Sequence, residues 1–323
     1  MKRFLITVAA VALSASAALG ADLKLTKAPP PPPPAPSPWD VAFGAAIMSD
    51  YMWRGITQSG HNPSVAAYTE LRYNYASSLQ FYGAISGESI SFPNRAAAEI
   101  DLYGGVRPTF GPVAFDFGYW YYDYPGGQCF YTQTPGLLEL NPGCSPALPN
   151  GNVAKQNWNF WEVYAKATWT INPQWALGAN YYYSPNLLNF GPEGNYVSGT
   201  LKFTSPWQLW TAGWYVSGEY GRQFIGNSDP FYGTAFNPAG FKYVDYSTWN
   251  VGVGFTWKVF TLDIRYWDSS LTPSQCSVWT SAQTASFNPG TISIYNPAGL
   301  NSNWCGSTVV AKLAFDMTLD SLK

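Results

Sequence analysis

The stretch AEIDLYGGVRPTFGPVAFDFGYWY, residues 98–121, decides the fold. Before the turn at 108–111, every second residue is apolar or glycine, and the residues between them include Glu99 and Asp101. After this turn, large apolar side chains alternate with Asp116 and with small or aromatic residues. A period of two predicts β-strands with two unlike faces. An aromatic face opposite a charged face is typical of a transmembrane β-barrel with an apolar outer band and a polar interior.

The same alternation recurs along most of the chain. The segments are about 9–13 residues long, which is enough for a tilted strand to cross a bilayer. The predicted strands are 39–48, 63–74, 79–87, 97–107, 112–122, 158–171, 175–183, 195–205, 209–220, 246–257, 260–268 and 307–320. We therefore expect an all-β fold, a transmembrane antiparallel up-and-down β-barrel of about 12 strands with a polar lumen, over residues 39–323.

The connections between these strands alternate in length. The long connections are 49–62, 88–96, 123–157, 184–194, 221–245 and 269–306, and the tight turns are 75–78, 108–111, 172–174, 206–208 and 258–259. Barrels of the bacterial outer membrane have short periplasmic turns and long external loops. An even number of strands then places both termini in the periplasm.

The N-terminus carries two segments that precede the barrel. Lys2 and Arg3, a following apolar stretch and small residues at Ala18 and Gly20 predict a signal peptide over 1–20 rather than a short buried helix. Residues 21–38 are rich in proline and predict an extended periplasmic spacer, with a partner-docking motif as the less favoured interpretation.

Composition supports a membrane location and excludes nucleic acid as a partner. Charged residues are 11% of the chain, whereas roughly 25% is usual in soluble proteins. Aromatic residues reach 18%, with 15 Trp and 23 Tyr, which settle at membrane interfaces. No basic patch or stripe is present in the sequence. We expect outer-membrane lipid and, during insertion, the barrel-assembly machinery as partners, and the oligomeric state stays open.

The charged side chains of the predicted strands and of the first loop fall mainly in the inward register. The predicted pore-lining residues are Asp50, Arg54, Glu70, Arg72, Glu99, Asp101, Arg107, Asp116, Glu162, Lys166, Lys202, Glu219, Asp263, Arg265, Lys312 and Asp316. Interspersed acids and bases predict weak charge selectivity with a slight preference for cations. The inward aromatic residues are expected to fill space in the lumen or, less favoured, to form a track for sugars. They are Tyr68, Tyr82, Tyr103, Trp120, Tyr164 and Tyr182.

Strand parity also predicts which way the side chains at the start of the first long loop face. It predicts that Asp50 and Arg54 face the lumen, while Tyr51 and Trp53 face outward in the upper aromatic girdle. An Asp50–Arg54 pair would then fix how the strand enters its loop or, less favoured, help to define the pore mouth.

The four cysteines lie in two of the long connections. Four cysteines allow three pairings, and the topology favours two local disulfides, Cys129–Cys144 and Cys276–Cys305. An exported protein meets an oxidising compartment where such bonds persist. A metal site needs clustered Cys and His ligands, whereas the single histidine lies in another loop, so no metal and no cofactor is expected.

His61 is the only candidate for a histidine general base, and its sequence context argues against catalysis. It lies in Ser59-Gly60-His61-Asn62-Pro63, which is typical turn chemistry. Glu99 and Asp101 suggest a glycosidase pair only weakly, because carboxylates at every second position are typical of any wet lumen. We expect no enzymatic activity.

The first loop carries a more specific motif. Ser49-Asp50-Tyr51-Met52-Trp53-Arg54-Gly55-Ile56-Thr57-Gln58-Ser59, followed by Pro63, resembles the S-D-Y-x-[FW]-R-G-[IV]-[ST]-Q-[ST] signature of the TorF-family porins of bacterial outer membranes. The similarity extends over roughly residues 40–260, through EIDLYGG at 99–105, YYDYPG at 121–126, WEVY at 161–164 and YYSP at 182–185. The cysteine-bearing loops look longer than is usual for that family. The chain also ends Asp320-Ser321-Leu322-Lys323 rather than on an aromatic residue, so the insertion signal would rest on 315–319.

Together, these features predict a porin-like channel in the outer membrane of a Gram-negative bacterium. It would transport small hydrophilic solutes by passive diffusion. The alternative is a non-conducting structural or adhesive barrel that acts through its disulfide-stapled external loops. Both interpretations remain open at this point, because a barrel of about 12 strands lies between filled and open bores.

Overall fold

The structure is a computed structural model that describes residues 37–127, 131–134, 137–140, 157–233 and 236–322. The predicted signal peptide and residues 21–36 of the predicted spacer lie outside this range. No helix of the described residues is long and apolar enough to cross a membrane.

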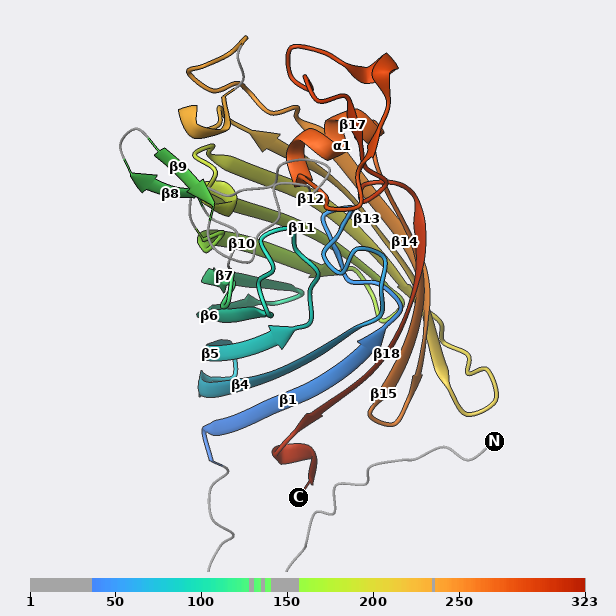
Figure 1. Cartoon of the computed structure of the whole chain (residues 1–323). Coiled ribbons are helices and arrows are strands. Elements are labelled where there is room, and N and C mark those ends of the chain that lie inside the picture. The colour runs from blue at the N-terminus through green and yellow to red at the C-terminus, as the bar shows by residue number, and fades with distance from the viewer. Residues whose placement is uncertain (1–36, 128–130, 135–136, 141–156, 234–235, 323) are drawn as a thin grey trace, which may run out of the picture. The chain divides into compact units, whose positions relative to one another are not determined.

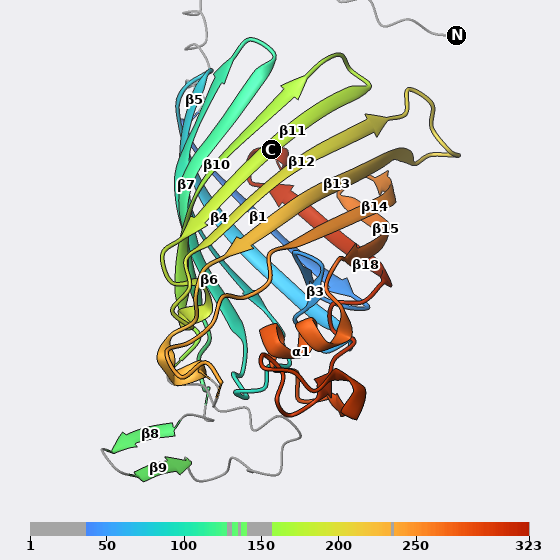
Figure 2. The same cartoon turned by 90° about the horizontal axis from the view of Figure 1, so that it is seen from above.

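Twelve long antiparallel strands of the described chain form one closed barrel (Figures 1 and 2). They are β1 (Trp39–Met48), β4 (Ser64–Ala76), β5 (Leu79–Glu88), β6 (Glu99–Phe110), β7 (Val113–Asp123), β10 (Phe160–Thr170), β11 (Trp175–Ser184), β12 (Gly194–Thr204), β13 (Gly213–Ile225), β14 (Tyr246–Trp257), β15 (Phe260–Ser269) and β18 (Thr308–Thr318). Each pairs with its neighbours in chain order, and β1 closes the barrel by pairing with β18. The predicted fold class is confirmed, and each predicted strand corresponds to one of these.

The remaining elements are short and lie in the connections. Three two-stranded hairpins are formed by β2 (Met52–Trp53) with β3 (Ile56–Thr57), β8 (Tyr131–Thr134) with β9 (Leu137–Leu140), and β16 (Ser286–Phe287) with β17 (Leu300–Asn301). The helices are η1 (Leu187–Asn189), η2 (Pro230–Tyr232), α1 (Pro273–Thr280), η3 (Pro289–Thr291) and η4 (Asp320–Leu322). Helix α1 begins where a capping box of Thr272 and Gln275 satisfies its free amide groups and Pro273 occupies the first turn.

The two ends of the barrel differ, as the connection lengths predict. We call the end with the long connections 49–63, 89–98, 124–159, 185–193, 226–245 and 270–307 the loop end. The opposite turn end carries the short links and the two ends of the barrel sheet, at Trp39 and Thr318.

Two predicted turns are wrong in detail. Residues 108–110 continue β6, so that the turn is only Gly111 and Pro112, with Gly111 at φ 57°. Gly111 adopts this left-handed conformation without steric cost. Conversely, the link predicted at 206–208 runs from Ser205 to Ala212 and carries its own Leu209–Ala212 bridge. The added length comes mainly from β13, which begins at Gly213 rather than at residue 209.

The strand faces alternate as the sequence predicts. The outward register exposes apolar side chains such as Val163, Leu313 and Val251, the last with 52% of its surface accessible. The inward register carries Glu70, Glu99 and Glu162, all buried. Outward-facing charges in the described strands lie near the loop end, at Asp123, Arg222 and Asp268. The outer surface is therefore an apolar band with a polar rim on that side.

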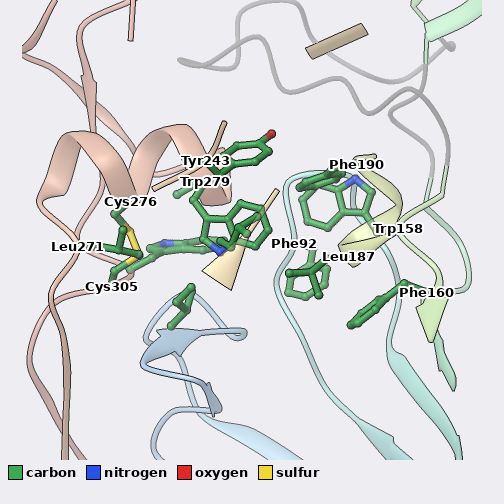
Figure 3. Close-up of a cluster of buried hydrophobic side chains, with 14 of the residues drawn as sticks. Phe92, Trp158, Phe160, Leu187, Phe190, Tyr243, Leu271, Cys276, Trp279 and Cys305 are labelled. Atoms are coloured by element: carbon green, nitrogen blue, oxygen red, sulfur yellow. A yellow bond between two sulfur atoms is a disulfide. The ribbon is translucent and has the colours of Figure 1, made fainter. Parts of the chain in front are cut away.

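The long connections pack together at the loop end in a buried apolar cluster, which we call the loop core (Figure 3). All six contribute to it, with Ile56, Phe92, Trp158, Leu187, Phe190, Tyr243, Leu271, Trp279 and Trp304. The ring centroids of Trp158 and Phe190 lie 5.1 Å apart at right angles, and those of Tyr243 and Trp279 lie 4.8 Å apart. Such edge-on contacts add to the stabilisation from apolar burial. The loops form a packed layer across this end of the barrel.

Candidate functional site

The candidate site is the interior of the barrel, and the connection 49–63 shapes it. This connection folds inward as the β2–β3 hairpin (Figure 2). Its turn residues Arg54 and Gly55 have φ values of 48° and 78°. A side chain at position 55 would overlap the Thr248 hydroxyl on β14, so only glycine permits this close approach. The hairpin thereby projects Arg54 toward the opposite wall.

Arg54 is the centre of a buried polar group that joins three segments far apart in the chain. Its Nη1 and Nη2 atoms donate to Glu162 Oε1 and Oε2 on β10 at 2.9 and 2.7 Å. Its Nη1 atom also donates to Gln223 Oε1 on β13 at 2.9 Å. Only 8% of Arg54 and 1% of Glu162 are exposed. A fork-shaped pair of this kind is among the strongest polar contacts that proteins make.

Aromatic rings surround the same guanidinium. The Arg54 Cζ atom lies 4.3 Å from the ring centroid of Trp53, 4.9 Å from that of Tyr182 and 4.5 Å from that of Tyr196. Burial lowers the pKa of Arg54, but the carboxylate of Glu162 raises it more, so that the net pKa lies above the ordinary value. The guanidinium therefore stays charged. We call Arg54, Glu162, Gln223, Tyr182 and Tyr196 the Arg54 cluster.

The predicted Asp50–Arg54 pair is wrong. Arg54 reaches Glu162, while Asp50 Oδ1 accepts hydrogen bonds from Thr57 at 2.5 Å and Ser59 at 2.9 Å. The outward placement of Tyr51 and Trp53 is also wrong, since Tyr51 donates to the inward Glu99 and Trp53 packs on Phe160 and Arg54. The parity argument fails because β1 ends at Met48 and the chain turns into a separate hairpin.

His61 connects the first and last long connections. Its Nδ1 lies 2.7 Å from Asp50 Oδ2, and its Nε2 lies 3.0 Å from the carbonyl oxygen of Asn303. The hydrogen bond with Asp50 raises the pKa of His61 above its ordinary value, and burial opposes this only in part. Oxygen acceptors thus face both ring nitrogens, which favours the doubly protonated imidazolium.

Most of the other predicted residues on the β4–β7 wall form one network. Arg107 donates to Glu70 Oε1 at 2.7 Å and Oε2 at 2.9 Å, and its Nε lies 3.3 Å from Asp116. Arg72 donates to the same Glu70 at 2.5 Å. Tyr82 lies under Arg107, with 3.5 Å between its ring centroid and the guanidinium carbon. Within this network, the two arginines therefore neutralise Glu70 and Asp116.

The remaining predicted residues lie on the inward register of β10 to β18. Asp263 accepts from Arg265 at 2.9 and 3.0 Å, and Glu219 accepts from Tyr196 at 2.9 Å. Lys166 lies 4.3 Å from the ring centroid of Tyr164. The last three residues are exposed although they point inward: Lys202, Lys312 and Asp316. The described interior is thus accessible to water on the β12 and β18 walls, whereas it is sealed around the Arg54 cluster.

Inward tyrosines lie against the wall where a neighbouring strand has glycine. A Cβ atom at Gly118 would overlap the Tyr164 ring, and one at Gly254 would overlap the Tyr215 ring. The glycine leaves a shallow recess in which the ring rests. These rings therefore occupy less of the bore than their size suggests.

Glu99 and Asp101 lie near the loop end of β6, where they meet Glu88 from β5. Sequence reasoning missed Glu88, and it also missed Gln223 and Tyr196 of the Arg54 cluster. A signal for Glu88 exists, because residues 88 and 99 end and begin two consecutive antiparallel strands and so lie opposite each other. No comparable local signal exists for Gln223, which is 169 residues from Arg54.

One predicted disulfide is confirmed. Cys276 in α1 and Cys305 are bonded, with sulfur atoms 2.04 Å apart, and they join two parts of the connection 270–307. Cys129 and Cys144 lie outside the described residues.

Comparisons with known proteins do not confirm the TorF-family resemblance. A family model described as a bacterial protein of unknown function (Gcw_chp) matches residues 33–141. No curated protein gives a significant match.

Several solved structures are similar to this chain at low sequence identity. An outer membrane channel from Pseudomonas putida F1 is 8% identical, with 88% of this chain and 97% of that one covered and a TM-score of 0.40. The KdgM porin is 6% identical, with coverage of 85% and 98% and a TM-score of 0.38. LpxR from Salmonella typhimurium is 9% identical, with coverage of 85% and 99% and a TM-score of 0.38. Identities this low do not transfer a function to the present chain.

Proposed function

We propose that this protein is an outer-membrane channel for passive diffusion of small hydrophilic solutes, with its loop end closed in the present conformation. The observation that carries the proposal is the two-part interior. Inward charges at Lys202, Lys312 and Asp316 are exposed. By contrast, Arg54, Glu162 and Gln223 of the Arg54 cluster are buried, and so is the loop core. A bore that is wet in one part and sealed in another fits a channel with a closed mouth.

The chemistry of the wall supports small polar solutes. The predicted pore-lining residues offer both signs of charge, and most of the charged groups on the β4–β7 wall are paired with each other. Charged side chains that already neutralise each other bind solutes of either charge only weakly. The three carboxylates near the loop end, Glu88, Glu99 and Asp101, add a slight preference for cations.

The proposed location is the outer membrane, with the turn end and both termini in the periplasm. The outward register of the barrel fits contact with lipid, since it exposes Val251, Leu313 and similar side chains. Insertion would use the barrel-assembly machinery, and the segment 315–319, most of which lies in β18, would carry the signal.

The proposed function includes no catalytic step. The imidazole of His61 is oriented by Asp50 and by the backbone of Asn303, which suits a structural bridge between two loops. The carboxylates of Glu99 and Asp101 lie beside a third carboxylate rather than as an isolated acid and base.

Planar-bilayer recording tests the proposal. The mature protein should conduct with brief, infrequent openings, and Arg54→Gln should raise the open probability several-fold, because the hairpin 52–57 loses its charged anchor to Glu162. Arg265→Gln is a matched control, since Arg265 is bonded within the β13–β15 wall rather than to the hairpin. A correctly folded barrel that stays silent as wild type and as Arg54→Gln would overturn the proposal.

The second candidate is a non-conducting barrel that acts through its loops. The loop core favours it, because all six long connections contribute side chains to one packed layer that contains a disulfide. Liposome swelling in graded sugars separates the candidates. Swelling that falls with solute size supports the channel, and no swelling with any solute supports the second candidate.

A further inference from the structure

Three carboxylates meet at the loop end of the β5–β6 pair. Glu88 lies directly opposite Glu99 in the strand register, and Asp101 is two residues further along the same inward face, opposite Ser86. One oxygen atom from each carboxylate lies within 4.8 Å of those of the other two. Like charges at such distances repel strongly, especially where water is scarce.

The side chains that donate hydrogen bonds to this acidic cluster are neutral. The Tyr51 hydroxyl donates to Glu99 Oε1 at 2.5 Å, and the Ser86 hydroxyl donates to Asp101 Oδ2 at 3.2 Å. A hydroxyl donor stabilises a carboxylate but brings no positive charge to balance it. The negative charge of the cluster therefore stays unbalanced, which favours a bound cation.

A second observation points to a missing partner. Asp101 is only 3% exposed, yet its Oδ1 atom has no hydrogen-bond partner. The Oε2 atom of Glu88 is also buried without a partner. Buried carboxylate oxygens rarely stay unpaired, since each costs a desolvation free energy that no contact offsets.

We propose that Glu88, Glu99 and Asp101 bind a calcium ion inside the barrel, just beneath the loops. Calcium takes six to eight oxygen ligands at about 2.3–2.6 Å, in flexible geometry. Two oxygens that share an ion at about 2.4 Å lie no more than about 4.8 Å apart, which matches the spacing of this cluster. Magnesium binds at about 2.0–2.1 Å and demands near-octahedral geometry, so it fits this spacing less well.

Calcium at this site would also stabilise the arrangement of the connections at the loop end. Glu99 accepts from Tyr51, which belongs to the same inward-folded connection as Arg54. The ion would thus link β5 and β6 directly, and would link the connection 49–63 to them through Tyr51. This site does not depend on whether the barrel conducts.

Terbium luminescence tests the site on the mature protein, purified in detergent and treated with EDTA. Terbium is a calcium analogue, and Tyr51 is close enough to Glu99 to sensitise its emission. The wild type should show saturable emission that calcium displaces. Asp101→Asn should weaken terbium binding at least ten-fold, while the matched control Asp316→Asn, at an exposed inward position bonded to Tyr68, should bind as the wild type does.

A second variant and a second measurement complete the test. Glu88→Gln should weaken binding as Asp101→Asn does, and calcium should raise the thermal unfolding temperature of the wild type but not that of either variant. Heat-modifiable gel mobility checks that each variant is folded. Emission that does not saturate, or equal terbium affinity in the wild type and the two cluster variants, would overturn the proposal.

Discussion

At the scale of single residues, Arg54 shows how one side chain can organise a whole end of the barrel. Its buried guanidinium forms a two-pronged pair with the buried Glu162 and contacts three aromatic rings. Taking such a charge out of water costs several kcal/mol, and only a complete set of partners offsets this cost. The pair therefore specifies where the hairpin 52–57 sits more than it adds net stability.

Breaking this pair should destabilise the barrel. Arg54→Met leaves Glu162 buried without its partner, which should lower the free energy of unfolding by about 3–5 kcal/mol. The double variant Arg54→Met/Glu162→Gln should recover part of this loss, because no unpaired charge remains. Urea unfolding in detergent, followed by tryptophan fluorescence, measures both. A double variant that is no more stable than Arg54→Met would show that the charge pair is not the cause.

His61 should make the stability of the loop end depend on pH. Its pKa in the folded protein is raised by Asp50, so its contribution is fully present below the unfolded pKa of about 6.5 and is lost as the pH rises through the folded value. His61→Asn keeps a residue that tolerates φ 61° but cannot become charged. We expect the difference in melting temperature between wild type and variant to be larger at pH 5.5 than at pH 9. Equal differences at both pH values would contradict a charged bridge.

At the scale of elements, the strands could be predicted from sequence, whereas the inward hairpin could not. A strand that faces apolar surroundings on one side and water on the other must alternate, so the alternation in β6 and β7 reveals both strand and face. The fold of residues 49–63 depends on contacts with Glu162, Gln223 and Asn303. No local pattern encodes such distant partners, and extending strand parity beyond Met48 therefore misplaced Tyr51 and Trp53.

The Cys276–Cys305 disulfide should stabilise the connection 270–307 rather than the barrel sheet. The two cysteines are 29 residues apart, and closing a loop of that size is worth about 3–4 kcal/mol in the chain-entropy model. Replacing both cysteines with serine should speed proteolysis within 270–307 while leaving the β-sheet circular dichroism unchanged. If the variant were as resistant as the wild type, the loop core alone would be sufficient to hold this connection.

At the scale of the whole molecule, the separation of apolar and polar faces decides where a charge can be placed. Val251 lies outward near the middle of β14, so Val251→Lys should lower the stability in lipid by about 2–4 kcal/mol. Asp316→Lys places the same side chain on an exposed inward position and should change stability by less than about 1 kcal/mol. Reversible folding into phospholipid vesicles measures both. Equal losses would mean that the two faces do not differ.

The most direct test of the central claim is a scan of nitroxide labels along β18 in liposomes. The claim is that outward side chains meet hydrocarbon while their neighbours one residue along meet the interior. Labels at 309, 311, 313 and 315 should collide mainly with oxygen, and labels at 310, 312, 314 and 316 mainly with a water-soluble nickel complex. A period of two in this accessibility is the predicted result, and a uniform profile along the strand would contradict it.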